Sequence, residues 1–151
     1  MRIEYLADHP EWITPLAQWH FQEWGKQLSP WTFEEARAEL HSHQKKTIPT
    51  TFIALNENSL LGSASLLIED VPEWKTLSPW LASVFVAPEY RSQGIGKKLV
   101  QQIEAEAKDL KVKELYLFTF DHEKYYLKMA WTLFEKTFYH AQPVAIMKKL
   151  L

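Results

Sequence analysis

The sequence predicts an α/β fold in which a mixed central sheet of about six or seven strands is flanked by about four helices. The first observation is the order of elements, which runs β, α, α, β, β, β, α, β, α, β, β along the chain. The second is a run without charged side chains, Trp80–Ala87, which is typical of a central strand buried on both faces. The third is the helix that follows, where Ile95, Leu99 and Ile103 recur at helical spacing.

The N-terminal part is expected to hold one short strand and two helices. Arg2–Leu6 carries the apolar residues of a strand. Thr14–Pro15 predicts a helix start, because threonine caps well and proline is favoured at the first helical position; Gly25 is a plausible stop. Thr32 followed by Glu35 forms a capping box, which predicts that a second helix begins there.

The remaining segments follow from β-forming runs and turn residues. Asn56–Asn58 predicts a hairpin turn, and Asp70–Pro79 predicts a loop over one end of the sheet. The strand–helix–strand unit around Gly94 should be parallel and right-handed. The expected strands are Thr51–Leu55, Leu60–Glu69, Trp80–Ala87, Leu115–Phe120, Trp131–Tyr139 and Val144–Lys149, with helices from Ile95 to about Leu110 and over Glu123–Ala130.

Composition narrows the functional classes. The 151 residues fit a single domain, 1–151. With 17 lysines and arginines against 19 acids, the net charge is −2, and no basic block of the nucleic-acid-binding kind occurs. There is no cysteine, which excludes disulfides and cysteine nucleophiles. No signal peptide and no apolar run of about 18 residues is present, so we expect a soluble, cytoplasmic protein that does not bind membranes.

The strand Trp80–Ala87 leads into a turn, Arg91-Ser92-Gln93-Gly94-Ile95-Gly96, that opens the amphipathic helix. The first amides of a helix lack internal partners, and the dipole there favours anions. A dinucleotide fingerprint would need glycine where Leu99 stands, and a nucleotide P-loop would need serine or threonine where Lys98 stands. Both of these phosphate motifs are therefore excluded.

The remaining pattern, Arg-x-x-Gly-x-Gly after a hydrophobic strand, resembles the signature of the GNAT superfamily of acetyl-CoA-dependent N-acetyltransferases. Arg91, Gly94 and Gly96 match every defined position, whereas Ser92 stands where the family often has glycine. A second stretch, Tyr125–Trp131, is similar to the family's Phe-Tyr-x-Lys-x-Gly-Phe/Trp, with Ala130 in place of the glycine. The order of elements agrees with the family over nearly the whole chain.

This resemblance implies a binding site for acetyl-CoA as co-substrate. The backbone N–H groups of the turn would hold the pyrophosphate, and main-chain groups of the central strand would hold the pantetheine arm, with one N–H polarising the thioester carbonyl. Alternatively, the strand is plain sheet core and Lys97 and Lys98 are merely solvated. The cofactor-binding residues expected from the resemblance are Val84, Phe85, Val86, Arg91, Ser92, Gln93, Gly94, Ile95, Gly96 and Lys97.

Tyr126 is the candidate general acid, because a neutral tyrosine can protonate a departing thiolate at neutral pH; its neighbour Tyr125 is the competitor. Glu69 and Asp70, at the end of the strand beside the central one, are the candidate general bases. Glu23, Glu73 and Glu89 remain alternatives for that role. Trp24 and Trp74 are the expected substrate-pocket residues, although tryptophans also pack protein cores. No HExxH or Cys/His cluster occurs, so no metal site is expected.

The function expected from the sequence is acetyl transfer from acetyl-CoA to a primary amine, by direct attack in a ternary complex. A small-molecule acceptor is favoured over a peptide, because the short chain carries no added recognition module. One alternative is a non-catalytic sensor that binds acyl-CoA on a GNAT-like fold, and another is transfer of a different acyl group. The sequence leaves a homodimer open, and it identifies the donor far better than the acceptor.

Overall fold

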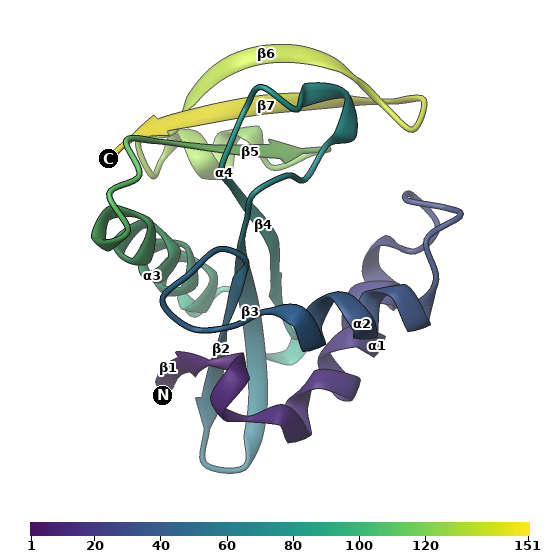
Figure 1. Cartoon of the computed structure of the whole chain (residues 1–151), viewed down its shortest axis with the longest axis vertical. Coiled ribbons are helices and arrows are strands. Elements are labelled where there is room, and N and C mark those ends of the chain that lie inside the picture. Colours follow the sequence, from purple (N-terminus) through teal and green to yellow (C-terminus); the bar gives the residue numbers. More distant parts are fainter.

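The computed structural model describes residues 1–151 as seven strands and four α-helices (Figure 1). The strands are β1 (Arg2–Tyr5), β2 (Thr50–Asn56), β3 (Ser59–Leu67), β4 (Trp80–Val86), β5 (Glu114–Thr119), β6 (Thr132–Tyr139) and β7 (Gln142–Leu150). The helices are α1 (Ile13–Trp24), α2 (Phe33–Ser42), α3 (Ile95–Asp109) and α4 (Glu123–Leu127). The predicted order of elements and the predicted mixed sheet are confirmed.

All seven strands belong to one sheet, in the order β1-β2-β3-β4-β5-β7-β6. Every neighbouring pair is antiparallel except β4 and β5, which are parallel as predicted for a strand–helix–strand unit. The β6–β7 pair arches over the end of the sheet, away from the vertical run of β2, β3 and β4 (Figure 1). The parallel junction therefore lies in the middle of the sheet, between its two antiparallel parts.

The two faces of the sheet are covered by different helices. In β2, Phe52 and Ala54 belong to the core that α3 covers, whereas Ile53 and Leu55 pack with α1 and α2. This alternation follows from the two-residue period of a strand, and the all-apolar run lets both faces be buried. Figure 1 shows α3 on one side of β2–β4 and the α1–α2 pair on the other.

Several local predictions hold to within a few residues. The Thr32 hydroxyl accepts a hydrogen bond from the Glu35 N–H at 3.1 Å, so the predicted cap of α2 is present. Helix α1 begins at Ile13, one residue before the predicted Thr14 start, and no side chain caps it. The predicted loop over Asp70–Pro79 contains a single 3-10 turn, Pro72–Trp74.

Two predictions needed correction. The helix expected over Glu123–Ala130 ends at Leu127, because the chain turns sharply and Ala130 takes a left-handed backbone conformation with φ of 68°. Strand β4, expected to be buried throughout, is only partly buried at Ser83, Val84 and Val86. These half-exposed positions lie at the point where β4 leaves its parallel neighbour.

Gly62 in β3 allows β4 to come close. A Cβ at this position would collide with the backbone oxygen of Phe85, so only glycine fits without moving the strand. The register between β2 and β3 also shifts between Ala54 and Leu55, next to this glycine. None of the helices combines the length and the apolar composition needed to cross a membrane.

Replacing Ala130 by glycine should stabilise the protein. A left-handed conformation costs an L-residue about 1–2 kcal/mol that glycine does not incur, so Ala130→Gly should raise the free energy of unfolding by about 1 kcal/mol and Tm by about 2–4 °C. The matched control is Ala105→Gly on the exposed face of α3, which should lower stability by about 1 kcal/mol. Thermal and urea unfolding measure both, and an Ala130→Gly variant as destabilised as the control would contradict the left-handed assignment.

Candidate active site

Strands β4 and β5 separate almost as soon as they meet. They share a single paired position, Trp80 with Tyr116, supported by a hydrogen bond of 3.1 Å from the Tyr116 N–H to the Pro79 oxygen. Beyond it, Leu81–Val84 and Leu117–Thr119 line opposite walls of a cleft of about 380 Å³. A regular parallel pair of strands forms backbone hydrogen bonds along its whole length. Because β4 and β5 diverge, backbone groups of both strands are left free to bind a ligand.

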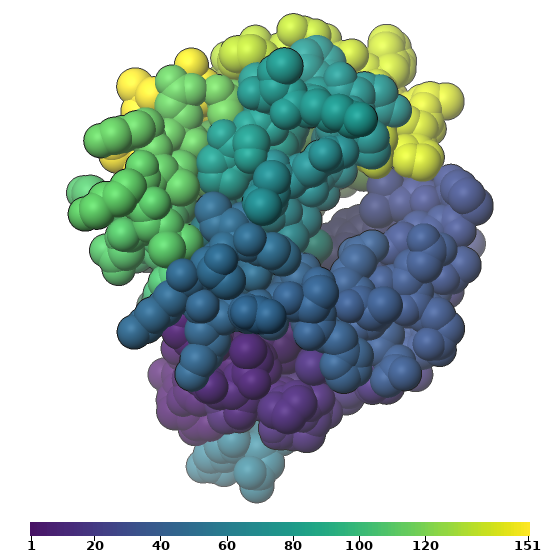
Figure 2. All heavy atoms as spheres, in the orientation of Figure 1, coloured from purple at the N-terminus to yellow at the C-terminus, as the bar shows by residue number.

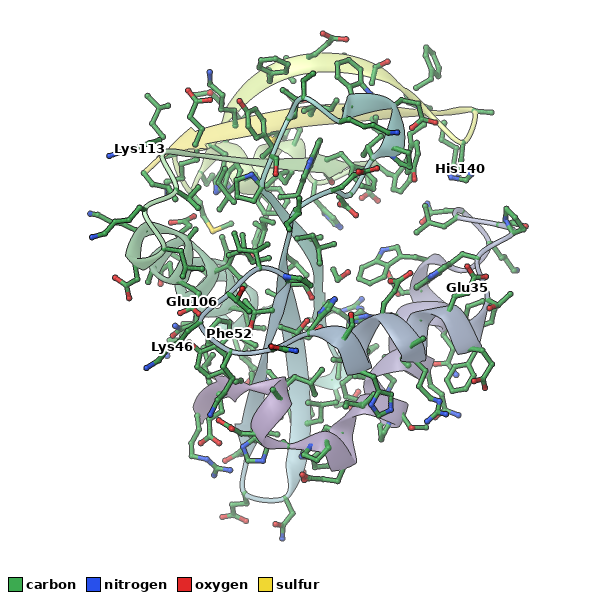
Figure 3. The ribbon with its side chains drawn as sticks, in the orientation of Figure 1. Glu35, Lys46, Phe52, Glu106, Lys113 and His140 are labelled. Atoms are coloured by element: carbon green, nitrogen blue, oxygen red, sulfur yellow. The ribbon has the colours of Figure 1, made fainter.

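Helices α1 and α2 and the β6–β7 hairpin border the cleft on its far side. Figure 2 shows the surface hollowed between the blue atoms of the α1–α2 region and the teal and yellow atoms above them. In Figure 3, His140 at the tip of the hairpin lies across this hollow from α2, which carries Glu35. The volume is within the usual range for a small-molecule site.

Strand β4 carries a bulge where it borders the cleft. Ser63 of β3 pairs with Phe85 and Ser65 pairs with Ala82, so one residue of β3 faces two of β4, and Ser83 takes a φ of 54°. A bulge of this kind leaves part of the ladder unpaired and redirects the strand. The bulge thus presents main-chain groups near Val84 to the cleft.

A buried hydrogen-bonded chain from α1 and β3 supports this bulge. The Ser63 hydroxyl donates to the Ser83 oxygen at 3.2 Å, and the Nε2 of His20 lies 2.9 Å from the same hydroxyl. Because the hydroxyl proton is used toward Ser83, His20 donates through Nε2. Burial lowers the pKa of His20, which is 3% exposed, to about 3, so the imidazole is neutral at physiological pH. No sequence pattern indicated that these residues lie together.

The glycine turn has the shape of an open helix end. Gly94 is the residue before α3, with a φ of 80°, and no side chain caps the first amides. An added Cβ on Gly94 would meet nothing within 4 Å, so the space above the turn is open to a ligand. Ser92, where the family often has glycine, also has a positive φ of 63°. The exposed turn and its free amides fit the anionic pyrophosphate of coenzyme A.

Arg91 and Ile95 fix the turn to the rest of the molecule. The Nε of Arg91 donates to the Val86 oxygen at 2.8 Å, and its guanidinium lies 5.5 Å from the centre of the Phe85 ring. Ile95 is buried in the core beneath α3. Gln93 and Lys97 are exposed on the outer side of the turn. The exposed side chain of Arg91 therefore ties the end of β4 to the turn.

The two adjacent tyrosines of α4 point to different places. Tyr126 lines the cleft, is 8% exposed and packs edge-on against Trp131, and its hydroxyl has no hydrogen-bond partner. Burial raises the pKa of Tyr126, with a smaller contribution from Tyr125, so the phenol keeps its proton. The Tyr125 hydroxyl instead lies against α3, 2.8 Å from where a Cβ on Gly96 would stand. Only Tyr126 faces the cleft.

The structure also separates the candidate bases. Asp70 lines the cleft, whereas Glu69, its neighbour, is exposed and lies outside the lining. Burial raises the pKa of Asp70 to about 7, and the nearby charge of Glu39 raises it further. Of the alternatives, Glu23 lines the cleft, while Glu73 and Glu89 do not.

The two tryptophans expected in the pocket also divide. Trp24 lines the cleft and meets the Phe85 ring edge-on at 6.2 Å. Trp74, in the segment between β3 and β4, does not line the cleft and packs against a small core cluster with Val71 and Trp80.

Comparison with known proteins assigns the family. The model of the acetyltransferase (GNAT) family matches residues 13–131, most of the chain. The chain belongs to the GNAT family of acetyltransferases. A search of curated protein sequences gives no match.

Solved structures share this GNAT fold over their whole length. An aminoglycoside 6′-N-acetyltransferase complexed with coenzyme A is 15% identical, with a TM-score of 0.78 over 99% of this chain and 97% of that one. The ribosomal-protein-alanine N-acetyltransferase from Brucella melitensis is 19% identical, with a TM-score of 0.77 over 100% of both chains. An aminoglycoside 6′-acetyltransferase type Ii is 19% identical, with a TM-score of 0.76 over 99% and 97%. At these identities, the similarity shows the fold alone.

Several residues of this GNAT cleft were not among the expected site residues. They come from segments whose position depends on tertiary packing: the α1–α2 loop, α2, the chain after β5 and the β6–β7 hairpin. They include Gln27, Leu28, Trp31, Glu39, Phe120, Asp121, His122, Tyr139 and His140. Trp31, Glu35 and Glu39 stand four residues apart in the sequence, but nothing there indicated which side chains face the sheet.

Proposed function

We propose that this chain transfers the acetyl group of acetyl-CoA to a primary amine of a small molecule. The observation that carries the proposal is the cleft itself. It opens where β4 and β5 diverge, and it brings together a protonated tyrosine, Tyr126, and a carboxyl group, Asp70, whose pKa lies near neutrality. A proton donor and a proton acceptor in one cleft are what aminolysis of a thioester requires.

The binding of acetyl-CoA is supported by the fit of the residues present. The free amides at the start of α3 suit a pyrophosphate, and the open space over Gly94 leaves room for it. The bulged part of β4 offers main-chain groups to an amide-rich arm. One solved structure of the same fold is a complex with coenzyme A.

The chain's own residues would then move two protons. An alkylammonium has a pKa of about 10.4, so making it neutral at pH 7 costs about 4.6 kcal/mol unless a base takes its proton. Asp70 accepts that proton, directly or through water, as the amine nitrogen bonds to the acetyl carbon. The carbon–sulfur bond breaks, and Tyr126 gives its proton to the departing thiolate. The products are the acetamide and the free thiol, and a main-chain N–H near Val84 stabilises the charge on the carbonyl oxygen in between.

Removing the Tyr126 hydroxyl should slow turnover selectively. We expect Tyr126→Phe to lower kcat by about 100-fold or more, because general acid catalysis contributes about 10²–10⁴-fold. Thiol release in the presence of an amine panel measures kcat, and a thermal shift with acetyl-CoA checks binding. Tyr116→Phe, which removes a tyrosine hydroxyl outside the cleft, is the matched control. Undiminished turnover in Tyr126→Phe would remove this residue from the mechanism.

The pH dependence should identify Asp70 as the base. Wild-type kcat/KM should rise tenfold per pH unit up to about pH 7, where the carboxyl loses its proton, and then level off because the ammonium form of the substrate supplies the reacting nitrogen. Asp70→Asn has no base and can react only with the neutral form of the amine. Its kcat/KM should therefore keep rising with pH up to the amine's pKa of about 10.4. Identical profiles for the two proteins would exclude Asp70.

The same assays separate catalysis from a sensor role. Binding of acetyl-CoA without thiol release on any amine would favour the non-catalytic acyl-CoA-binding module over an enzyme.

A further inference from the structure

The walls of the cleft are strongly acidic. Four carboxylates line it, and no lysine or arginine does, although the chain has 17 of these cations. Glu23 comes from α1, Glu39 from α2, Asp70 from the segment after β3 and Asp121 from the segment after β5. Four negatively charged side chains from separate parts of the chain thus line the same cleft.

Three of these carboxylates have no cationic partner within the protein. Asp121 lies 3.3 Å from His122, its neighbour in the chain. Glu23, Glu39 and Asp70 take part in none of the ion pairs of the structure. Glu23, Glu39 and Asp121 are exposed to solvent, and carboxylates gathered in one cleft create a negative field that attracts a cationic ligand.

Glu39 is held in place, and its charge acts on Asp70. The indole N–H of Trp31 donates to the Glu39 carboxylate at 3.0 Å, which orients it in the cleft. Partial loss of water raises the pKa of Glu39, and the negative charge of Glu39 contributes to the raised pKa of Asp70. The two groups are therefore close enough to interact, although they come from opposite sides of the cleft.

The other walls suit an organic cation. Trp24, Trp31, Phe118, Phe120 and Tyr139 contribute aromatic rings to the lining, and aromatic faces attract ammonium groups. The Tyr126 side chain is more than nine-tenths buried, reaches the cleft and has no hydrogen-bond partner. The Tyr126 hydroxyl is not among the fully buried polar atoms that lack a partner, so it is available to a ligand in the cleft.

We infer that the acceptor carries at least two amines: one reacts beside Asp70 and Tyr126, and the other is held as an ammonium ion by Glu23 and Glu39. This inference rests on the proposed function. The two tasks need different carboxylates, because a base that takes a proton from the reacting nitrogen cannot also remain paired with a permanent cation. Asp70 serves the first task, and the pair on α1 and α2 serves the second, with Trp31 packed beside it.

Substrate preference of the wild-type protein tests the inference without any variant. Thiol release is measured with saturating acetyl-CoA on α,ω-diamines of three to six carbons and on spermidine, each matched to a primary monoamine of the same length. We expect kcat/KM to be about 10- to 100-fold higher for the best diamine than for its monoamine, the range expected from added hydrogen bonds to a charged group. A ratio no greater than about two, the statistical effect of a second amine, would overturn the inference.

A substitution that removes the charge of Glu39 tests whether this carboxylate binds the second ammonium group. Glu39→Gln should reduce the diamine-to-monoamine ratio of kcat/KM by about tenfold, because a neutral amide cannot pair with the cation. Glu34→Gln, on the exposed side of the same helix and outside the cleft, is the matched control and should leave the ratio as it is. A ratio unaltered in a folded Glu39→Gln protein would overturn the assignment of Glu39.

The failures of the two proposals are distinguishable. Equal rates on diamines and monoamines would overturn the dication inference while acetyl transfer to amines stands. Preferential turnover of peptide α-amines that carry no second cation would also overturn it. Thiol release on no amine, with acetyl-CoA bound, would overturn the proposed function and the inference together.

Discussion

The structure depends on the divergence of two parallel strands. One pairing, Trp80 with Tyr116, joins β4 to β5, and both rings are buried in a small cluster on the sheet. Past this point the bulge at Ser83 turns β4 away, and the cleft opens between the strands. Backbone N–H and C=O groups need hydrogen-bond partners, so those left unpaired in this gap bond to water or to a ligand. The gap is therefore the part of the sheet whose backbone groups are available to a ligand.

Hydrogen bonds and close packing hold the β4 side of this gap in place. His20 bonds to Ser63, Ser63 bonds to the bulge at Ser83, and Gly62 lets β4 lie close to β3 at the neighbouring position. Arg91 ties the glycine turn to the last carbonyl of β4. The start of α3, which attracts anions, thus lies next to the strand end, while the acidic part of the cleft lies beyond the bulge. This separation of charge suits the proposed anionic donor at one end and the proposed cationic acceptor at the other.

Much of the fold could be predicted from the sequence, but the acceptor side of the site could not. Apolar periodicity and turn residues located every strand, since burial and backbone sterics act locally. The turn at Gly94 was recognisable because a few adjacent residues, Arg91–Gly96, determine its backbone conformation and leave its amides open. In contrast, Glu69 and Asp70 are adjacent, and only the path of the chain after β3 decides that Asp70 enters the cleft. The same holds for Trp24 and Trp74, and for Glu39, whose position depends on how α2 packs on α1.

The central claim is that the β4–β5 gap and the glycine turn together bind acetyl-CoA. Amide hydrogen exchange of the wild-type protein, with and without saturating acetyl-CoA, tests it most directly. We expect slower exchange at residues 93–97 and 84–86, and no change in the β2–β3 turn at residues 56–59, which lies far from the cleft. Binding without protection at residues 93–97 and 84–86, or with protection confined to another face of the molecule, would contradict the account.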